Sequence, residues 1–357
     1  MKKSTLYLLY YKKYISLKLF VILRRRLIRN GRRVEQRDNW TERAFRLENC
    51  SEKECWDYFR FRKDDIPTLR VCLKIPDSVV TATGDHASGI EALCILLRRL
   101  AYPNRWIDLR KLFGRSHGSL SRIFYATLNI VDIQWKNHLS TWDHDWLSED
   151  FFALYATAIA GKGGVIPNVF GFIDGTARPI CRPSVNQEIM YSGHKRFHCT
   201  KWQSVVLPNG LICSLSGSQP GTMHDSRMFR ESGLLEQLEK KQKTYQRKFI
   251  LYGDQGYGNN AFLRKPFSKL EVRTNLLKRM QNNAMKTVRE SVEWGFKEVV
   301  AKFAFVDFKK QMALLQKPIN KMSRVAVLLT NCINCMYPNE ASQFFDTEPP
   351  TLQEYLQ

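Results

Sequence analysis

The sequence predicts an α/β fold in which a mixed sheet lies between helices and follows a helical domain. The first observation is the stretch 170–176, where apolar residues run into Asp174 and a turn glycine, as in a buried strand whose exposed end carries a carboxylate. A similar run at 249–256 delivers Asp254, and a helical pattern at 289–296 carries Glu293. Three carboxylates on three separated elements predict a divalent-metal site that acts on phosphate.

The composition points to a nucleic-acid partner. The chain has 357 residues, enough for two domains, and its 44% hydrophobic content excludes a wholly disordered protein. Its formal net charge is +22. A polyanion partner explains this excess, because each Lys or Arg that neutralises a phosphate releases a counterion. A basic protein without such a partner is the alternative, and the charge favours nucleic acid.

The nine cysteines predict free thiols in a reducing compartment. Their number is odd, and most lie in apolar surroundings. Cys332 and Cys335 form a single CxxC pair, and a zinc site would need a second pair. We therefore expect both to occupy core positions of a C-terminal helix.

Residues 1–40 read as a basic leader arm, partly helical. Their longest uncharged run, 19–23, is far too short to span a bilayer, and no secretory signal is visible, so we expect no membrane association. A mitochondrial presequence is less favoured. The arm's basic cluster is predicted to be a nuclear address, a DNA-binding arm for phosphate, or both. Its first members are Arg24, Arg25 and Arg26.

Residues 41–160 are predicted to form a helical domain with a helix-turn-helix over about 89–131. Apolar periodicity marks helices at 89–100 and 105–113, and a glycine-containing turn leads to a third helix capped by Ser116. A helix-turn-helix places the start of its last helix on DNA. A small helical bundle is the alternative. The residues expected to contact DNA there are Ser116, His117, Ser119, Ser121 and Arg122.

From residue 168 onward the signals alternate. Strands are predicted at 168–174, 200–207, 211–217 and 249–252, and helices at 224–238 and 282–303. This order of elements is that of an RNase H-like core: antiparallel strands, then a helix, a further strand and a late helix. We assign this nuclease domain to 168–335, after a glycine-rich hinge at 161–164, and a C-terminal tail to 336–357.

The predicted chemistry is two-metal phosphodiester cleavage. Two divalent ions about 3.5–4 Å apart activate water and stabilise the leaving oxygen, and Mg²⁺ prefers carboxylate oxygens. Asp174 is expected to bridge the ions, with Asp254 and Glu293 each holding one. Arg289, one helical turn before Glu293, is expected to orient it or to meet phosphate. Asp225 is either a helix cap or a further metal ligand.

Residues 191–198 concentrate basic and aromatic side chains just before a predicted strand. His194, Lys195 and Arg196 suit a loop that grips a DNA backbone. A solvated turn is the alternative for this segment.

The same motifs resemble those of the PIF/Harbinger-type transposases, the DDE superfamily endonuclease 4 group. The resemblance runs through Asp174-Gly-Thr, Tyr191-Ser-Gly-His-Lys-Arg, Pro220-Gly-Thr-Met-His-Asp-Ser and Gly253-Asp-Gln-Gly-Tyr. It continues in Val-Glu-Trp-Gly-Phe at 292–296 and covers roughly residues 85–357.

The resemblance implies a nuclear transposase that binds the terminal repeats of a mobile element. Such an enzyme cuts DNA with Mg²⁺ or Mn²⁺ and joins the freed 3′-hydroxyl to target DNA. Carried over by position, Asp174, Asp254 and Glu293 are the catalytic acids, and Asp225 is a fourth metal ligand. A Myb/SANT-like partner protein supplied in trans and a homo-oligomer are further expectations.

The sequence leaves two other functions open. One is a domesticated, non-cleaving DNA- or chromatin-binding protein on the same fold. The intact acids favour the nuclease over this alternative. The other is a repair or RNA-directed nuclease, against which the predicted helix-turn-helix and the motif resemblance count.

Overall fold

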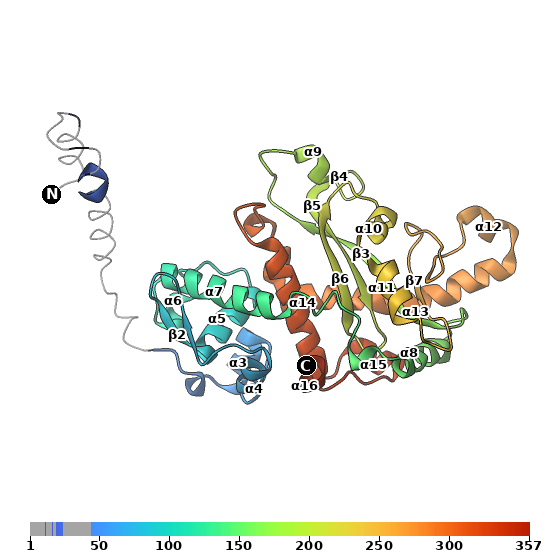
Figure 1. Ribbon diagram of the computed structural model, residues 1–357, viewed down its shortest axis with the longest axis horizontal. Coiled ribbons are helices and arrows are strands. Elements are labelled where there is room, and N and C mark those ends of the chain that lie inside the picture. The colour runs from blue at the N-terminus through green and yellow to red at the C-terminus, as the bar shows by residue number, and fades with distance from the viewer. Residues whose placement is uncertain (1–10, 12–15, 17–18, 24–43) are drawn as a thin grey trace. The chain divides into compact units, whose positions relative to one another are not determined.

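The computed structural model describes residues 11, 16, 19–23 and 44–357, without the side chains of 291–293 (Figure 1). Most of the predicted leader arm, including Arg24, Arg25 and Arg26, lies outside the described residues. The chain divides into two compact units, one made of Met1–Phe45 with Arg110–Arg115 and the other of Arg46–Leu109 with Ser116–Gln357. The short helix α6 (Arg110–Phe113) belongs to the first unit. The predicted helix-turn-helix, 89–131, thus contains residues of both units, and its arrangement stays a prediction.

The helical part of the larger unit surrounds the nearly wholly buried helix α5 (Gly89–Ala101). Helix α7 (His117–Trp135) packs against α5 and begins where predicted, because the Ser116 hydroxyl accepts a hydrogen bond from the Ser119 amide at 3.2 Å. The remaining elements here are η2 (Leu47–Asn49), α3 (Glu52–Phe59), α4 (Asp65–Cys72), β1 (Ser78–Val80), β2 (His86–Ser88) and η3 (Asp145–Leu147).

A six-stranded mixed sheet forms the centre of the same unit. Strand β5 pairs antiparallel with β3, β4 and β6, whereas β7 runs parallel to β3 and β8 runs parallel to β7. The mixed sheet predicted from the sequence is thus confirmed. The strands are β3 (Val169–Pro179), β4 (Tyr191–Ser192), β5 (Phe197–Val206), β6 (Ile212–Pro220), β7 (Ile250–Tyr252) and β8 (Leu263–Arg264).

Helices cover both faces of the sheet, as the alternation along β3 shows. On one face Phe170 stacks on Phe152 of α8 (Glu149–Gly161) at 4.1 Å, and Asp174 pairs with Arg289 of α13 (Leu276–Lys302). On the other face Gly175 lies against α10 (Asp225–Glu231). The predicted α/β class, with helices flanking the sheet, is confirmed.

The remaining helices complete this unit. They are α9 (Gln187–Met190), α11 (Leu234–Lys241), α12 (Lys269–Thr274), η4 (Ala304–Asp307), η5 (Lys309–Gln311), α14 (Ile319–Met336), α15 (Glu340–Phe345) and α16 (Leu352–Tyr355). No helix among the described residues is long and apolar enough to cross a bilayer. Cys332 and Cys335 lie on α14, which confirms the helix predicted around the CxxC pair.

Some element boundaries differ from those predicted. Strand β3 continues to Pro179 instead of ending at Asp174, because its long partner β5 keeps pairing with it after β7 has ended. The helix predicted at 224–238 is broken at Gly233, whose φ of +69° lies in the left-handed region that favours glycine. Helix α13 begins at Leu276 rather than at residue 282.

The helical elements and the sheet pack within one unit. Arg324 of α14 makes two hydrogen bonds to the buried Asp132 of α7, at 2.9 and 3.0 Å. The predicted domain boundary near 161–164 stays a prediction, since such packing does not tell whether either part folds alone.

Asn331 of α14 binds the edge strand β6 through its side chain. Its amide accepts from the Ile212 N–H at 3.0 Å and donates to the Ile212 carbonyl at 2.8 Å. The same amide donates to the Tyr355 hydroxyl at 2.8 Å, and Asn331 is fully buried. Because an unsatisfied buried group is costly, this one side chain secures the contact between helix and sheet.

We predict that Asn331→Ala lowers the free energy of unfolding by about 2–4 kcal/mol, since it leaves the buried Ile212 N–H and carbonyl without partners. Urea unfolding followed by circular dichroism measures the change. Asn283→Ala, at an exposed position of α13, is the matched control and should shift stability by less than about 0.5 kcal/mol. Equal effects of the two substitutions would contradict the role given to Asn331.

Candidate active site

The register of β3 and β7 brings two acids together just beyond the end of the ladder between these strands. Phe172 is paired with Tyr252 in the last step of this parallel ladder. Asp174 and Asp254 each follow that pair by two residues, so they leave the ladder side by side. Parallel neighbours lie about 4.8 Å apart. Two acids that are distant in sequence are therefore neighbours in space.

Asp225, the first residue of α10, completes a cluster of three carboxylates. A Cβ atom placed on Gly256 would lie 3.0 Å from Asp225 Oδ2 and 3.0 Å from Asp254 Oδ1. Because both oxygens lie 3.0 Å from the same position, the distance between them is at most twice that value. A Cβ on Gly175 would lie 2.8 Å from Asp225 Oδ1. Glycine at these two positions lets the acids approach the backbone and each other.

Two basic side chains pair with two of the three acids, Asp174 and Asp225. Arg289 of α13 donates from Nη2 to Asp174 Oδ1 at 3.2 Å, and neither side chain is more than 27% exposed. Lys201 of β5 donates to Asp225 Oδ1 and to the Met223 carbonyl, both at 2.8 Å. Each pair joins residues from different elements, so the site is held by tertiary contacts.

Burial raises the pKa of Asp174 to about 6. The guanidinium of Arg289 opposes this shift, whereas the charges of Asp254 and Asp225 add to it. A raised pKa means that the ionised carboxylate is destabilised where it stands. This is the electrostatic condition in which a bound cation is favoured.

The donor chemistry of the cluster suits a hard divalent ion. The Tyr257 hydroxyl is buried beside the acids with no hydrogen-bond partner among the described residues. Burial, followed by the charges of Asp225, Asp174 and Asp254, raises the pKa of Tyr257 well above its usual range, so the hydroxyl stays a donor. Such an orphaned donor fits a site that takes up a further polar ligand.

Asp174, Asp225 and Asp254 alone do not form a complete coordination site for a metal ion. Among the described side chains, no three carboxylate, imidazole or thiol groups are arranged to hold one ion. The side chain of Glu293, the predicted third catalytic acid, lies outside the described residues, although its backbone belongs to α13. Arg289, one turn earlier on that helix, reaches Asp174, so α13 passes beside the cluster.

Sequence reasoning missed two residues of this site. The sequence predicts only that Lys201 lies in a strand. One feature distinguishes it: it is the only charged residue in the run 200–207. Tyr257 closes the Gly253–Tyr257 motif but was given no role. Arg289 was expected to orient Glu293 or to meet phosphate, whereas the structure pairs it with Asp174.

The three basic residues predicted to contact DNA beside the sheet lie together on an exposed turn. His194, Lys195 and Arg196 connect β4 to β5, and the Arg196 amide donates to the Ser192 carbonyl at 2.7 Å. The turn is continuous with the strand that carries Lys201 (Figure 1). Contact of these three with DNA stays a prediction.

The residues predicted to contact DNA at the start of α7 differ in exposure. His117 is exposed, whereas Ser119 is only 8% exposed. Arg122 is paired with Asp85, with 3.0 Å between Nη2 and Oδ1. Ser116 caps the helix. Contact of Ser119 or Arg122 with DNA would therefore require their present packing or pairing to change.

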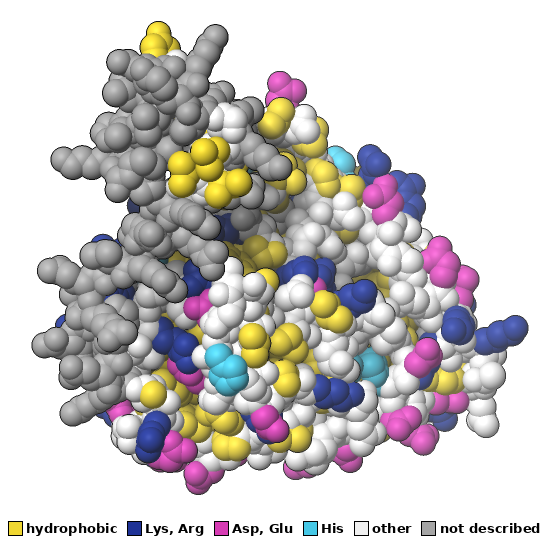
Figure 2. All heavy atoms as spheres, turned by 60° about the vertical axis from the view of Figure 1, so that its left-hand side comes forward, with side chains coloured by type: hydrophobic (Ala, Val, Ile, Leu, Met, Phe, Trp, Pro, Cys, Tyr) yellow, Lys and Arg dark blue, Asp and Glu magenta, His cyan; other side chains and the backbone are white. Residues whose placement is uncertain are grey.

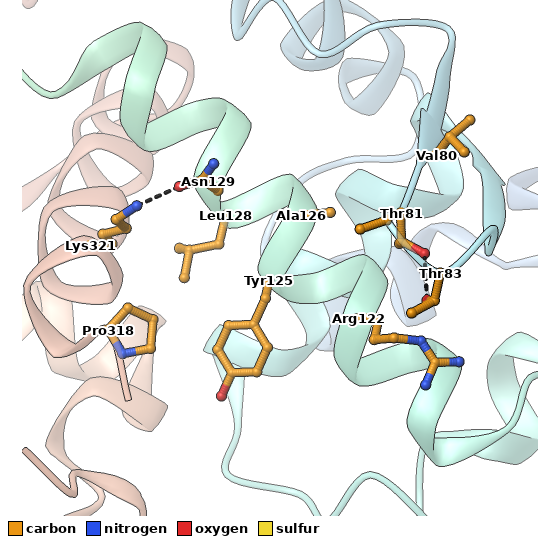
Figure 3. A pocket seen from close by; sticks show the side chains of 11 residues that line it. Val80, Thr81, Thr83, Arg122, Tyr125, Ala126, Leu128, Asn129, Pro318 and Lys321 are labelled. Atoms are coloured by element: carbon orange, nitrogen blue, oxygen red, sulfur yellow. Dashed lines mark hydrogen bonds between the residues drawn. The ribbon is translucent and has the colours of Figure 1, made fainter. Parts of the chain in front are cut away.

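A cavity of about 470 Å³ lies between α7, β1 and the start of α14 (Figure 3). Tyr125 and Lys321 line it, and Lys321 hydrogen-bonds to Asn129 there. None of the three clustered acids contributes to this cavity. It is therefore separate from the candidate active site.

Comparison with known proteins supports the motif resemblance. Residues 173–331 match a family described as DDE superfamily endonuclease, and this range includes the clustered acids and Glu293. Protein ALP1-like of Arabidopsis thaliana is 24% identical over 206 residues, which are 54% of this chain and 48% of that protein. The chain thus spans about half the length of this relative. No solved structure matches the chain.

The charge of Asp174 is predicted to lower the stability of the folded protein above pH 6. A carboxyl group whose pKa is raised from 3.8 to about 6 binds its proton more tightly when folded, so the penalty is present above pH 6 and vanishes below pH 3.8. In EDTA, Asp174→Asn should raise the free energy of unfolding by about 1–3 kcal/mol at pH 7.5.

Urea unfolding at pH 7.5 and pH 3.5 measures this effect. The gain should disappear at the lower pH, and Asp150→Asn, at an exposed position of α8, should give none at either pH. A loss of stability at pH 7.5 in Asp174→Asn would show that the ion pair with Arg289 outweighs the burial of the charge.

Proposed function

We propose that this chain, whose residues 173–331 match the DDE superfamily endonuclease family, is a divalent-metal-dependent nuclease that cuts DNA at the ends of a mobile element. The freed 3′-hydroxyl is then joined to target DNA, as in a transposase. The observation that carries the proposal is the meeting of Asp174, Asp225 and Asp254 just beyond the end of the β3–β7 ladder, within the matched residues.

The topology of the sheet supports an RNase H-like assignment. The first strand of the region, β3, lies between its antiparallel neighbour β5 and the parallel strand β7, and β8 follows outside β7. Asp174 and Asp254 then come from the central pair of strands. In open sheets with parallel strands, active sites lie beyond the carboxyl ends of those strands.

Asp174, Asp254, Asp225 and Glu293 are the residues that would hold Mg²⁺ or Mn²⁺. When bound, two such ions supply an activated water and stabilise the leaving oxygen of the phosphodiester. Arg289 and Lys201 keep the acids in place and lie where a phosphate would approach. The buried Tyr257 hydroxyl offers a donor to a carboxylate or a bound water.

The other parts of the proposal concern DNA recognition. We infer that the terminal repeats are bound through a helix-turn-helix over 89–131, the 194–196 turn and the basic leader arm. A nuclear location, a homo-oligomer and a Myb/SANT-like partner protein belong to the same proposal. The net charge of +22 supports a DNA partner.

A non-cleaving DNA- or chromatin-binding protein is the second candidate. The ion pairs Arg289–Asp174 and Lys201–Asp225 favour it, because they neutralise two of the three clustered acids without any metal. A fold kept for binding alone needs only this neutralisation. Cleavage assays distinguish the two candidates.

We predict that purified protein nicks supercoiled plasmid with Mg²⁺ or Mn²⁺, and that Asp174→Ala and Asp254→Asn each lower the nicking rate at least 100-fold. Catalytic metal ligands give losses of this order. DNA affinity, measured by filter binding in EDTA, should change less than threefold. Asp150→Ala should preserve both nicking and binding.

The outcomes separate the candidates. Nicking that persists in Asp174→Ala would remove Asp174 from the chemistry. Salt-sensitive DNA binding without nicking, also with native repeat ends and a candidate partner present, would support the non-cleaving protein.

A further inference from the structure

The segment 265–286 forms a projecting tip on the larger unit, which we call the basic tip. It contains α12 and the first turns of α13, and in Figure 1 both extend away from the sheet. Helix α12 has no buried residue. Its described stabilising contacts are local, namely the Ser268–Glu271 capping box and the ion pair of Glu271 with Lys278 at 2.9 Å.

Four large apolar side chains of the basic tip are exposed, whereas Met285 is buried. The exposed fractions are 72% for Leu270, 58% for Leu276, 75% for Leu277 and 59% for Met280. Four such residues within eleven positions are unusual for a surface that faces only water. Because a helix gains most of its stability from burying an apolar face, this tip is suited to a partner.

The charge of the basic tip defines that partner. The segment contains six Lys or Arg residues and one acidic residue, Glu271, which is already paired. On the face shown in Figure 2, by contrast, acidic and basic side chains are interspersed. A second copy of this surface would be repelled by the like charge. A polyanion with accessible apolar edges complements it, and duplex DNA has this chemistry.

The position of the basic tip on α13 relates it to the cutting site. Leu277 and Glu293 lie sixteen residues apart on one continuous helix, which corresponds to about 24 Å. The same distance along a duplex is about seven base pairs. A duplex whose scissile bond lies at the acids therefore reaches the tip if it follows α13.

We propose that the basic tip is a second DNA-binding surface, which holds the duplex about seven base pairs from the scissile bond. Arg273 and Arg279 contact phosphates, and Leu270 and Leu277 contact deoxyribose and base edges. The distance to the scissile bond rests on the proposed nuclease function, whereas the DNA contact itself does not.

The charge contacts are tested by the salt dependence of DNA binding. Wild type and the double variant Arg273→Gln/Arg279→Gln are titrated with a 30-base-pair duplex from about 50 to 300 mM KCl. Two lost phosphate contacts should reduce the slope of log K against log salt by about 1.8. The control Lys53→Gln/Lys240→Gln removes the same charge at exposed positions of α3 and α11 and should leave the slope within about 0.5 of wild type.

The apolar contacts are tested with Leu270→Gln/Leu277→Gln. At constant salt this variant should bind DNA about five- to tenfold more weakly, with an unchanged salt slope. The matched control is Leu154→Gln, at an exposed position of α8, which should bind like wild type. Circular dichroism confirms that each variant is folded.

The proposal would be overturned if both tip variants bound DNA with the affinity and the salt slope of wild type. That result would point to an acidic protein as the partner of the tip. Equal losses in the tip and control variants would also overturn it, because the effect would then reflect net charge alone. These outcomes are independent of nicking, which tests the acids.

Discussion

The parallel pairing of β3 with β7 is the constraint on which the candidate site depends. The ladder ends at Phe172 and Tyr252, and the chain places an acid two residues later on each strand. A shift of either strand by one residue would turn one acid to the opposite face. The apolar residues of both strands hold this register, since Phe170, Phe172 and Leu251 are almost completely buried. The packing of the core therefore holds the carboxylates of Asp174 and Asp254 close together despite their mutual repulsion.

The gathered charges create an electrostatic cost that the structure offsets locally. Like charges and burial both disfavour ionised Asp174, whereas Arg289 from a helix far along the chain favours it. Lys201 pairs with Asp225 at 2.8 Å, and it also donates to the Met223 carbonyl just before α10. The two basic residues thus keep an acidic site folded.

The sequence placed Asp174 and Asp254 beside the correct strands, but it did not reveal their partners. Apolar runs ending in an acid are local patterns, and they correctly located Asp174 and Asp254 near the central strands. The pairs Arg289–Asp174 and Lys201–Asp225 join residues 115 and 24 positions apart, and no local periodicity encodes such contacts. The extension of β3 past Asp174 depends on the length of its partner β5. Helix α12 was missed because it buries no residue and so lacks an apolar face pattern.

The central claim, a divalent-metal site made by acids from β3, α10, the end of β7 and α13, is tested most directly by metal-directed cleavage of the protein. Fe²⁺ bound in place of Mg²⁺ generates hydroxyl radicals that cut the backbone near the bound ion. With ascorbate and peroxide, the account predicts fragments ending near residues 174, 225, 254 and 293, which excess Mg²⁺ suppresses and Asp174→Ala abolishes. Cleavage confined to other parts of the chain, or cuts at these positions that Mg²⁺ does not suppress, would contradict the account.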